Sequence, residues 1–361
     1  MATFAANCQS TAMGIMPHRD VGKALELAFS LDIPFWPQLP NVSFYEDMYA
    51  QASEHFPGVS VDFKGERLLF DTPCFMDEME EYSRRIAEPD YLALSQEYSA
   101  VFHRFLRHDL SRYSAIRGQM TGPVSWGFKV TDEEGKPVIY NEAVRTILFD
   151  FMQRKVNAQY HQLREKNANA FVWLDEPGLG WVFSGFTGYG EVQAKVDYES
   201  FVRGLEGPAA LHLCANVNLS YLLSMGVEIL SFDAFQIEVM PRVYAEAVAD
   251  FLRRGNIICW GIVPTDSRSL NSQSIERLLG LLEGYWQKVS QSSDISLSVI
   301  ARQSLIAPAR CCLKNIGAVG GAEDCPVGEA RPVTGSMEEM LVETAFGYVR
   351  EMSRRLKERY L

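Results

Sequence analysis

The sequence AALHLCAN at residues 209–216 combines an apolar run with two side chains that bind metals, His212 and Cys214. The run has the length and composition of a buried β-strand. Because alternate side chains of a strand point to the same side, His212 and Cys214 would project together near its carboxyl end. A second pair of thiols, Cys311 and Cys312, follows another apolar run, SLIAP at residues 304–308. One histidine and two thiolates form a zinc ligand set, and such a site is catalytic when one coordination position stays open.

Eight apolar runs of this kind alternate along the chain with amphipathic segments. The runs predict strands at Thr11–Met16, Ile33–Gln38, Ala115–Met120, Ala170–Leu174, Ala209–Leu213, Val227–Phe232, Ile257–Val263 and Ser304–Ala307. The amphipathic segments predict helices at Val21–Leu31, Asn141–Lys166, Tyr198–Leu205, Leu219–Met225, Pro241–Arg254, Ser274–Ser290 and Ser336–Tyr360. This alternation favours parallel strands joined by helical crossovers. Eight such strands predict an α/β protein, a single (β/α)8 TIM barrel over residues 1–361.

The longest gap, residues 41–114 between the second and third predicted strands, is interpreted as an insertion into the barrel. It contains a hairpin pattern at Val59–Phe70 and a polar helical pattern around residues 90–108. A further hairpin is predicted at Phe128–Tyr140, with its turn at residues 133–136. The glycine-rich and proline-containing residues 314–335 predict a loop after the last strand, either a lid over the site or a plain surface loop.

Composition narrows the class of protein. The 361 residues are 47% hydrophobic and 22% charged, as in ordinary globular proteins. The formal charge of −12 argues against a nucleic-acid partner. No apolar run is long enough to span a membrane, and the start of the chain does not resemble a signal peptide. Seven cysteines, an odd number, favour a reducing cytoplasm over a disulfide scaffold.

Charged and polar residues follow three other predicted strands. Asp175 and Glu176 end the fourth, where one carboxylate would meet a cation on a substrate and the other would make a structural hydrogen bond. The alternative is a solvated turn. Asp233 ends the sixth strand, as a metal ligand, a substrate contact or a helix cap. His18 follows the first strand, where it would contact substrate, cap a helix or face solvent.

Zinc held by thiolates would suit a sulfur substrate. A thiol that binds the metal loses its proton and becomes a strong nucleophile at neutral pH. The natural reaction is attack on an electrophilic carbon, most simply a methyl group on a carrier. Hydrolysis by zinc-bound water would more often use ligands rich in histidine or carboxylate and a dedicated base. The sequence has no phosphate-binding loop, no dinucleotide-binding loop and no nucleophile elbow.

The order of these motifs resembles the catalytic, C-terminal barrel of cobalamin-independent methionine synthase. This family belongs to a superfamily with uroporphyrinogen decarboxylase and the corrinoid-protein:thiol methyltransferases. The resemblance covers most of the chain and rests on Gly14–Pro17, Thr121–Pro123, Asp175–Pro177, His212–Cys214, Gly261–Pro264 and Ser304–Pro308 with Cys311. It implies that His212, Cys214 and Cys311 bind zinc, with Cys312 as the alternative to Cys311. It also implies that Asp233 stands where the family has a glutamate, and that Asp175 holds the amino group of homocysteine.

The chain departs from that family in three places. Gly14-Ile15 replaces the family's Gly-Ser, and PARCCL at residues 308–313 is one residue longer than Pro-x-Cys-Gly-Leu and lacks its glycine. These two differences argue against homocysteine itself as the acceptor. No additional N-terminal barrel precedes residue 11, which argues against a folate donor and favours a methylated corrinoid protein.

We therefore predict a cytoplasmic, zinc-dependent methyltransferase that transfers a methyl group to a small-molecule thiol. Asp175 and Glu176 would orient the substrate, and Asp233 would be a displaceable ligand. One alternative is a metal-free lyase like uroporphyrinogen decarboxylase, although only His18 and Arg19 stand where that enzyme is rich in arginine. The other is a barrel that binds a ligand without catalysis.

Overall fold

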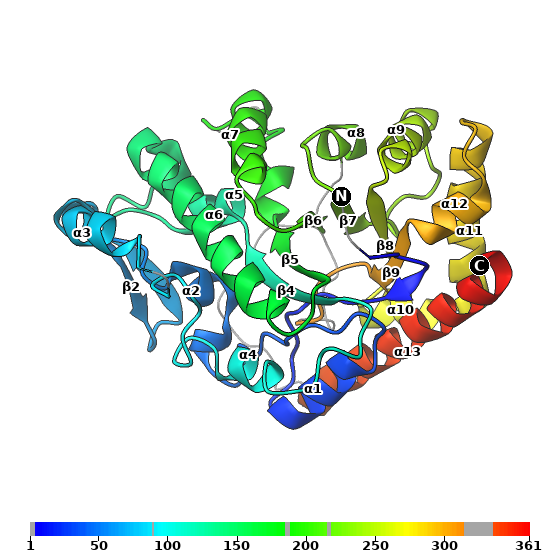
Figure 1. The fold of residues 1–361 in the computed structure, drawn as a ribbon, viewed down its shortest axis with the longest axis horizontal. Helices are drawn as coiled ribbons and strands as arrows, with labels where there is room; N and C mark the ends of the chain where they lie inside the picture. The colour runs from blue at the N-terminus through cyan, green and yellow to red at the C-terminus, as the bar shows by residue number, and fades with distance from the viewer. Residues whose placement is uncertain (1–3, 89, 185–187, 215–217, 314–334) are drawn as a thin grey trace.

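The main sheet consists of seven parallel strands. The computed structural model describes residues 4–88, 90–184, 188–214, 218–313 and 335–361. Its strands follow the order β1-β9-β8-β7-β6-β5-β4. Their bounds are β1 (Gln9–Ser10), β4 (Ile116–Thr121), β5 (Ala170–Asp175), β6 (Ala209–Leu213), β7 (Ile229–Asp233), β8 (Ile257–Val263) and β9 (Ser304–Pro308). Every residue of β4 to β9 is buried, because helices cover the outer face of the curled sheet and side chains fill its inner face (Figure 1).

The predicted second strand, residues 33–38, is not a regular strand in the structure. It contains two prolines, which cannot donate hydrogen bonds to a ladder. It makes isolated parallel bridges, one between Phe35 and Arg117 of β4 and one between Gln38 and Ile15. The segment therefore lies between the two edge strands of the sheet. Six of the other seven predicted strands are present. The first is displaced, because β1 covers only Gln9–Ser10 and ends before the predicted Thr11–Met16, where the structure has an isolated bridge at Ile15.

All seven predicted helices are present, with ends that differ by one or two residues except at α7, which begins seven residues earlier. Side-chain caps explain several of their starts: Asp20 and Asn141 accept hydrogen bonds from the first turns of α1 and α6. The seven predicted helices are α1 (Val21–Phe29), α6 (Glu142–Arg164), α7 (Glu191–Arg203), α8 (Leu219–Leu223), α9 (Arg242–Arg253), α11 (Ile275–Gln291) and α13 (Gly335–Tyr360). Three further helices were not predicted: α5 (Pro123–Lys129), α10 (Ser267–Ser272) and α12 (Leu297–Arg302).

The insertion contains the predicted hairpin, an antiparallel pair of β2 (Val59–Asp62) and β3 (Arg67–Phe70). Short helices surround it: η1 (Phe44–Glu46), α2 (Met48–Ser53), α3 (Thr72–Arg85) and α4 (Ala100–Phe105). Within residues 90–108, where a polar helix was expected, the only helix described is α4. The hairpin predicted at Phe128–Tyr140 is correct only at its turn, where the Gly135 N–H donates to the Asp132 carbonyl oxygen; its two strands are absent. Pro123 starts helix α5 there, η2 (Val138–Tyr140) follows, and a single antiparallel bridge joins Thr131 to Pro137.

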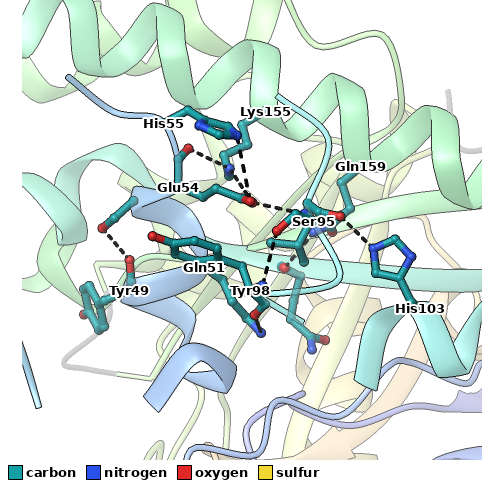
Figure 2. Close-up of polar contacts among 12 residues, drawn as sticks. Tyr49, Gln51, Glu54, His55, Ser95, Tyr98, His103, Lys155 and Gln159 are labelled. Carbon is teal, nitrogen blue, oxygen red and sulfur yellow. Dashed lines mark hydrogen bonds and ion pairs between the residues drawn. The ribbon is translucent and has the colours of Figure 1, made fainter. Parts of the chain in front are cut away.

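A buried ion pair joins the insertion to the sheet's outer layer (Figure 2). Lys155 of α6 and Glu54, just after α2, have side chains only 4% and 3% exposed, with 3.6 Å between Nζ and Oε2. Nζ also donates to the Glu54 carbonyl oxygen at 3.0 Å, and Oε2 accepts from the Ser95 backbone N–H at 3.1 Å. The pair therefore links α6 to two separate parts of the insertion.

Burial lowers the pKa of Lys155 to about 8, below its ordinary value. Between that pH and about 10.4 the unfolded chain binds more protons than the folded chain, so this group makes stability rise with pH. The free energy of unfolding of the wild type, minus that of K155M, should therefore increase from pH 7.5 to pH 10 in urea titrations. The control is K195M, which removes a half-exposed lysine of α7. A difference that stays flat or falls for K155M would contradict this prediction.

Gly261 lies where backbone surrounds it on several sides. A Cβ at this position would be 2.5 Å from the Phe232 carbonyl oxygen and 3.0 Å from the Ala309 Cα. Its own carbonyl oxygen accepts from the backbone N–H groups of Ala234 and Phe235, at 2.9 and 3.1 Å. The missing side chain therefore lets β7, β8 and the end of β9 approach one another.

We expect Gly261→Ala to lower the free energy of unfolding by about 1–3 kcal/mol, because backbone atoms must move apart to admit the methyl group. Gly284→Ala is the matched control. Gly284 lies in α11 with open space at its Cβ position, so alanine should leave stability unchanged or raise it by up to about 1 kcal/mol. Equal effects of the two substitutions in urea unfolding would refute the packing argument.

Candidate active site

The candidate site lies at the edge of the sheet where the parallel strands end. Thr121 at the end of β4 is in register with Asp175, and Asp175 is in register with His212 of β6. His212 is in register with Ser231 of β7, two residues before Asp233. The residues predicted at the ends of β5, β6 and β7 therefore lie at one edge of the sheet.

His212 has one ring nitrogen engaged and one free. Its Nδ1 lies 3.0 Å from the Ser231 hydroxyl oxygen, whereas its buried Nε2 has no hydrogen-bond partner within the part of the chain described. Burial lowers the pKa of His212 to about 3, with a further contribution from the charge of Arg117, so the imidazole is neutral. Neutral imidazole is the form that binds metals, and a hydrogen bond on the other nitrogen is the usual way to orient it.

Cys214 follows directly after β6 and is half-buried. Burial, together with the nearby Cys311 and Asp175, raises the pKa of its thiol to about 12, and Arg310 opposes these effects. Cys311 is exposed, whereas Cys312 is buried in the main hydrophobic core. Because Cys311 is among the groups that raise the pKa of Cys214, the two thiols lie near each other. Which of the two adjacent cysteines binds metal stays a prediction.

Asp233 forms an ion pair rather than standing free. Its side chain is 1% exposed, and its Oδ2 accepts from Nε of Arg310 at 2.6 Å. Its Oδ1 accepts from the backbone N–H of Gln236 at 3.2 Å, which closes the turn after β7. Both carboxylate oxygens therefore have protein partners. The contact with Gln236 caps a turn and not a helix, since the next helix, α9, begins at Arg242. Its role as a metal ligand is still a prediction.

The two adjacent carboxylates after β5 differ in their surroundings. Glu176 is fully buried, and its oxygens accept from the Val124 N–H at 3.1 Å, the Ser125 N–H at 2.7 Å and the Ser125 hydroxyl at 2.6 Å. Gly122 makes room for it, because a Cβ there would lie 2.1 Å from Oε1. Glu176 thus makes the structural hydrogen bonds at the start of α5, and a substrate contact for Asp175 stays a prediction.

Burial raises the pKa of Asp175 to about 7, and the charge of Arg117 opposes this effect. Arg117 itself is completely buried inside the curled sheet, between the rings of Phe35 at 4.8 Å and Trp173 at 4.6 Å. Its Nε donates to the Thr11 hydroxyl at 3.1 Å. A fixed positive charge therefore lies beneath the candidate site and favours the ionised form of Asp175.

His18 is buried, so the interpretation that it faces solvent is wrong. The cap of α1 is Asp20, whose Oδ1 accepts from the N–H groups of Gly22 and Lys23, so the capping interpretation is also wrong. Burial lowers the pKa of His18, and the carboxylates Glu339 and Glu343 of α13 oppose this. A substrate contact for His18 stays a prediction.

The donor atoms suit zinc, since one imidazole nitrogen and two sulfurs are ligands that zinc prefers. The free Nε2 of His212 also fits, because a buried ring nitrogen normally has a partner. However, no group of three or more His, Cys, Asp or Glu side chains in the described residues is arranged to hold a metal ion. Cys214 and Cys311 would therefore have to close on His212 when metal binds.

Sequence reasoning missed three residues of this region: Arg117, Ser231 and Arg310. Arg117 had a visible signal, a charged residue with Gln119 and Thr121 on one face of an apolar strand. Ser231 had no such signal, because a serine within a strand is common. Arg310 appeared only as part of a lengthened motif, and its partner Asp233 lies 77 residues away in sequence.

No family model matches the chain, and no curated protein matches it in sequence. Solved structures do share its fold. A B12-independent methionine synthase from Shewanella sp. W3-18-1, in complex with selenomethionine, is 11% identical, with a TM-score of 0.52 over 94% of this chain and 88% of the other. A methyltransferase from Methanosarcina mazei is 14% identical, with a TM-score of 0.54 over 97% of this chain and 95% of the other. The chain therefore shares the fold of these two proteins. None of its described helices combines the length and apolar character needed to cross a membrane.

Ser125 provides a test of the structural role of Glu176. Its hydroxyl donates to Glu176 and accepts from the Gly178 N–H at 2.8 Å, and the residue is buried. Ser125→Ala should lower the free energy of unfolding by about 1–3 kcal/mol, because it leaves a buried charged group without one hydrogen bond. Ser83→Ala removes an exposed hydroxyl of α3 as the control. A Ser125→Ala protein as stable as the control in urea would argue that the Glu176 contacts are dispensable.

Proposed function

We propose that this protein is a zinc-dependent methyltransferase that methylates the sulfur of a small-molecule thiol, with a methylated corrinoid protein as the donor. The observation that carries the proposal is the buried Nε2 of His212, which has no partner among the described residues. His212 lies on the strand that Cys214 directly follows, and Cys214 lies close enough to Cys311 to interact with it electrostatically. A fold shared with methyltransferases supports the same conclusion. The abundance of free cysteines suits a reducing compartment, which we take to be the cytoplasm.

In this proposal His212, Cys214 and Cys311 would hold the zinc ion, and Ser231 would keep the His212 ring in the orientation that presents Nε2. When bound, zinc makes a thiol acidic enough to be present as thiolate at neutral pH. In the reaction the carbon–sulfur bond forms as the donor's cobalt–carbon bond breaks, cobalt keeps the electron pair, and the thiol proton passes to solvent.

The remaining residues would position the acceptor. Asp175 lies in register with His212, and the buried Arg117 favours its charged form, so it can hold a cationic group of the substrate. Glu176 would act indirectly, by fixing the start of α5 beside that carboxylate.

The same proposal includes a closed (β/α)8 barrel. Residues 33–38 have backbone contacts on both sides: the Ile33 N–H donates to the Ser10 carbonyl oxygen at 3.0 Å, and the Arg117 N–H donates to that of Pro34 at 3.1 Å. We interpret this segment as the irregular eighth strand. Closure would place every strand end around one mouth, which is where enzymes with this fold carry their active sites.

Metal content tests the proposal. Protein purified without chelator should contain about one zinc per chain, and Cys214→Ala should lose it, because two remaining donors bind zinc weakly. Cys74→Ala, which removes an exposed thiol of α3, should keep the metal. Zinc-loaded wild type should consume methylcobalamin when thiols are added.

Three outcomes would count against the proposal. Absence of zinc from native protein would favour the metal-free lyase. Zinc that persists in Cys214→Ala would show a different metal site. Bound zinc without methylation of any thiol tested would favour a barrel that binds a ligand without catalysis.

A further inference from the structure

A small buried cavity lies among β4, α6, residues 33–38 and the insertion. The volume open to the centre of a water molecule is about 10 Å³, which is room for one water. Every residue that lines the cavity is buried. Its wall includes the side chains of Trp36, Gln38, Gln51, Lys155 and Gln159, the last three of which are labelled in Figure 2. The polar groups of this wall decide what the cavity can hold.

Hydrogen bonds fix which end of the Gln38 amide is unsatisfied. Its Nε2 donates to Gln51 Oε1 at 2.8 Å. Gln51 in turn donates through Nε2 to the Tyr98 backbone carbonyl oxygen at 3.2 Å, and a carbonyl oxygen can only accept. The directions of both amides are therefore set, and Gln38 Oε1 is buried without a partner among the described residues.

Gln159 and Trp36 add a second acceptor and a donor. Gln159 Nε2 donates to the Gln119 backbone carbonyl oxygen at 3.3 Å, so Oε1 is the end of the Gln159 amide that remains. Neither this oxygen nor Trp36 Nε1 has a hydrogen-bond partner in the described part of the chain. Two acceptors cannot bond to each other, and a buried polar group without a partner is strongly unfavourable. The wall of the cavity thus has two acceptors and one donor that need a partner.

One water molecule satisfies all three groups, because it can donate two hydrogen bonds and accept two. Other small occupants do not. A metal cation or an ammonium ion cannot accept from the Trp36 indole, and an anion cannot donate to the amide oxygens of Gln38 and Gln159. Lys155 can supply a second donor, since its ammonium has three protons and both of its described oxygen contacts are with Glu54. The pattern of donors and acceptors therefore matches water.

We propose that this cavity is a binding site for one structural water molecule, which donates to Gln38 Oε1 and Gln159 Oε1 and accepts from Trp36 Nε1. The water joins residues 33–38 to α6. That segment makes only isolated bridges to its neighbouring strands, so the water supplies part of the bonding that a regular ladder would give. The site is independent of the proposed methyl transfer.

Crystals of the full chain, at a resolution that shows ordered water, test the site directly. One density peak should lie about 2.6–3.2 Å from both amide oxygens, Gln38 Oε1 and Gln159 Oε1, and from Trp36 Nε1. A peak that contacts both amide oxygens supports the proposal. Absence of such a peak, or direct hydrogen bonds among the three side chains, would overturn it.

A double-mutant cycle tests the link in solution. Gln38→Met and Gln159→Met each replace an amide by a side chain of similar size, and each should raise the equilibrium constant for unfolding in urea by about 5- to 100-fold. The two amide oxygens make no hydrogen bond in the described structure, so the amides are coupled through the water. Either change removes an acceptor of that water, so the second should cost at least about 3-fold less when the first is present. Additive effects would overturn the proposal.

Gln162→Met is the matched control for the cycle. Gln162 is a half-buried glutamine of α6 that does not line the cavity, so its substitution should be additive with Gln38→Met. Coupling of equal size in this control pair would overturn the assignment of the coupling to the water. If a variant fails to fold, the density in wild-type crystals decides between the two results.

Discussion

The candidate site depends on the parallel register of β4 to β7. Parallel strands end at the same edge of a sheet. The residue-by-residue pairing of these strands therefore places Thr121, Asp175 and His212 next to one another without any direct bond between their side chains. Hydrogen bonds then refine this arrangement. Ser231 orients the His212 ring, Glu176 fixes the start of α5, and Arg310 pairs with Asp233. A slip of one residue in any strand would turn these side chains to the other face of the sheet.

The fold was largely predictable because the strands are buried on both faces. Continuous apolar runs such as Ile257–Val263 leave little choice of structure, and six of the eight predicted runs are found as strands. The errors occur where local patterns mislead. The segment Phe128–Tyr140 alternates in hydrophobicity like a hairpin, but Pro123 has already started a helix that includes Phe128. Residues 33–38 have a strand's apolar pattern, while their prolines interrupt the ladder.

The candidate site was predictable in part. Residues near the strand ends, such as Asp175, His212 and Asp233, follow from strand positions alone. What the sequence could not show is how their side chains are paired. Whether Asp233 faces a metal or a guanidinium depends on a contact with Arg310 across 77 residues, and the division of labour between Asp175 and Glu176 depends on α5. The loop predicted at residues 314–335 lies, except for its last residue, outside the described part of the structure.

The ion pair between Lys155 and Glu54 has a consequence for how this chain can be divided. The insertion occupies one continuous stretch of sequence and looks removable, like an appended module. Yet Lys155 belongs to a helix that packs on β4 and β5, and its charge is neutralised by Glu54 of the insertion. A shortened chain that lacked residues 41–114 would lose the carboxylate that pairs with this ammonium group, together with the backbone carbonyl that accepts its hydrogen bond. The insertion is therefore packed as a part of the folding unit rather than as an appended module.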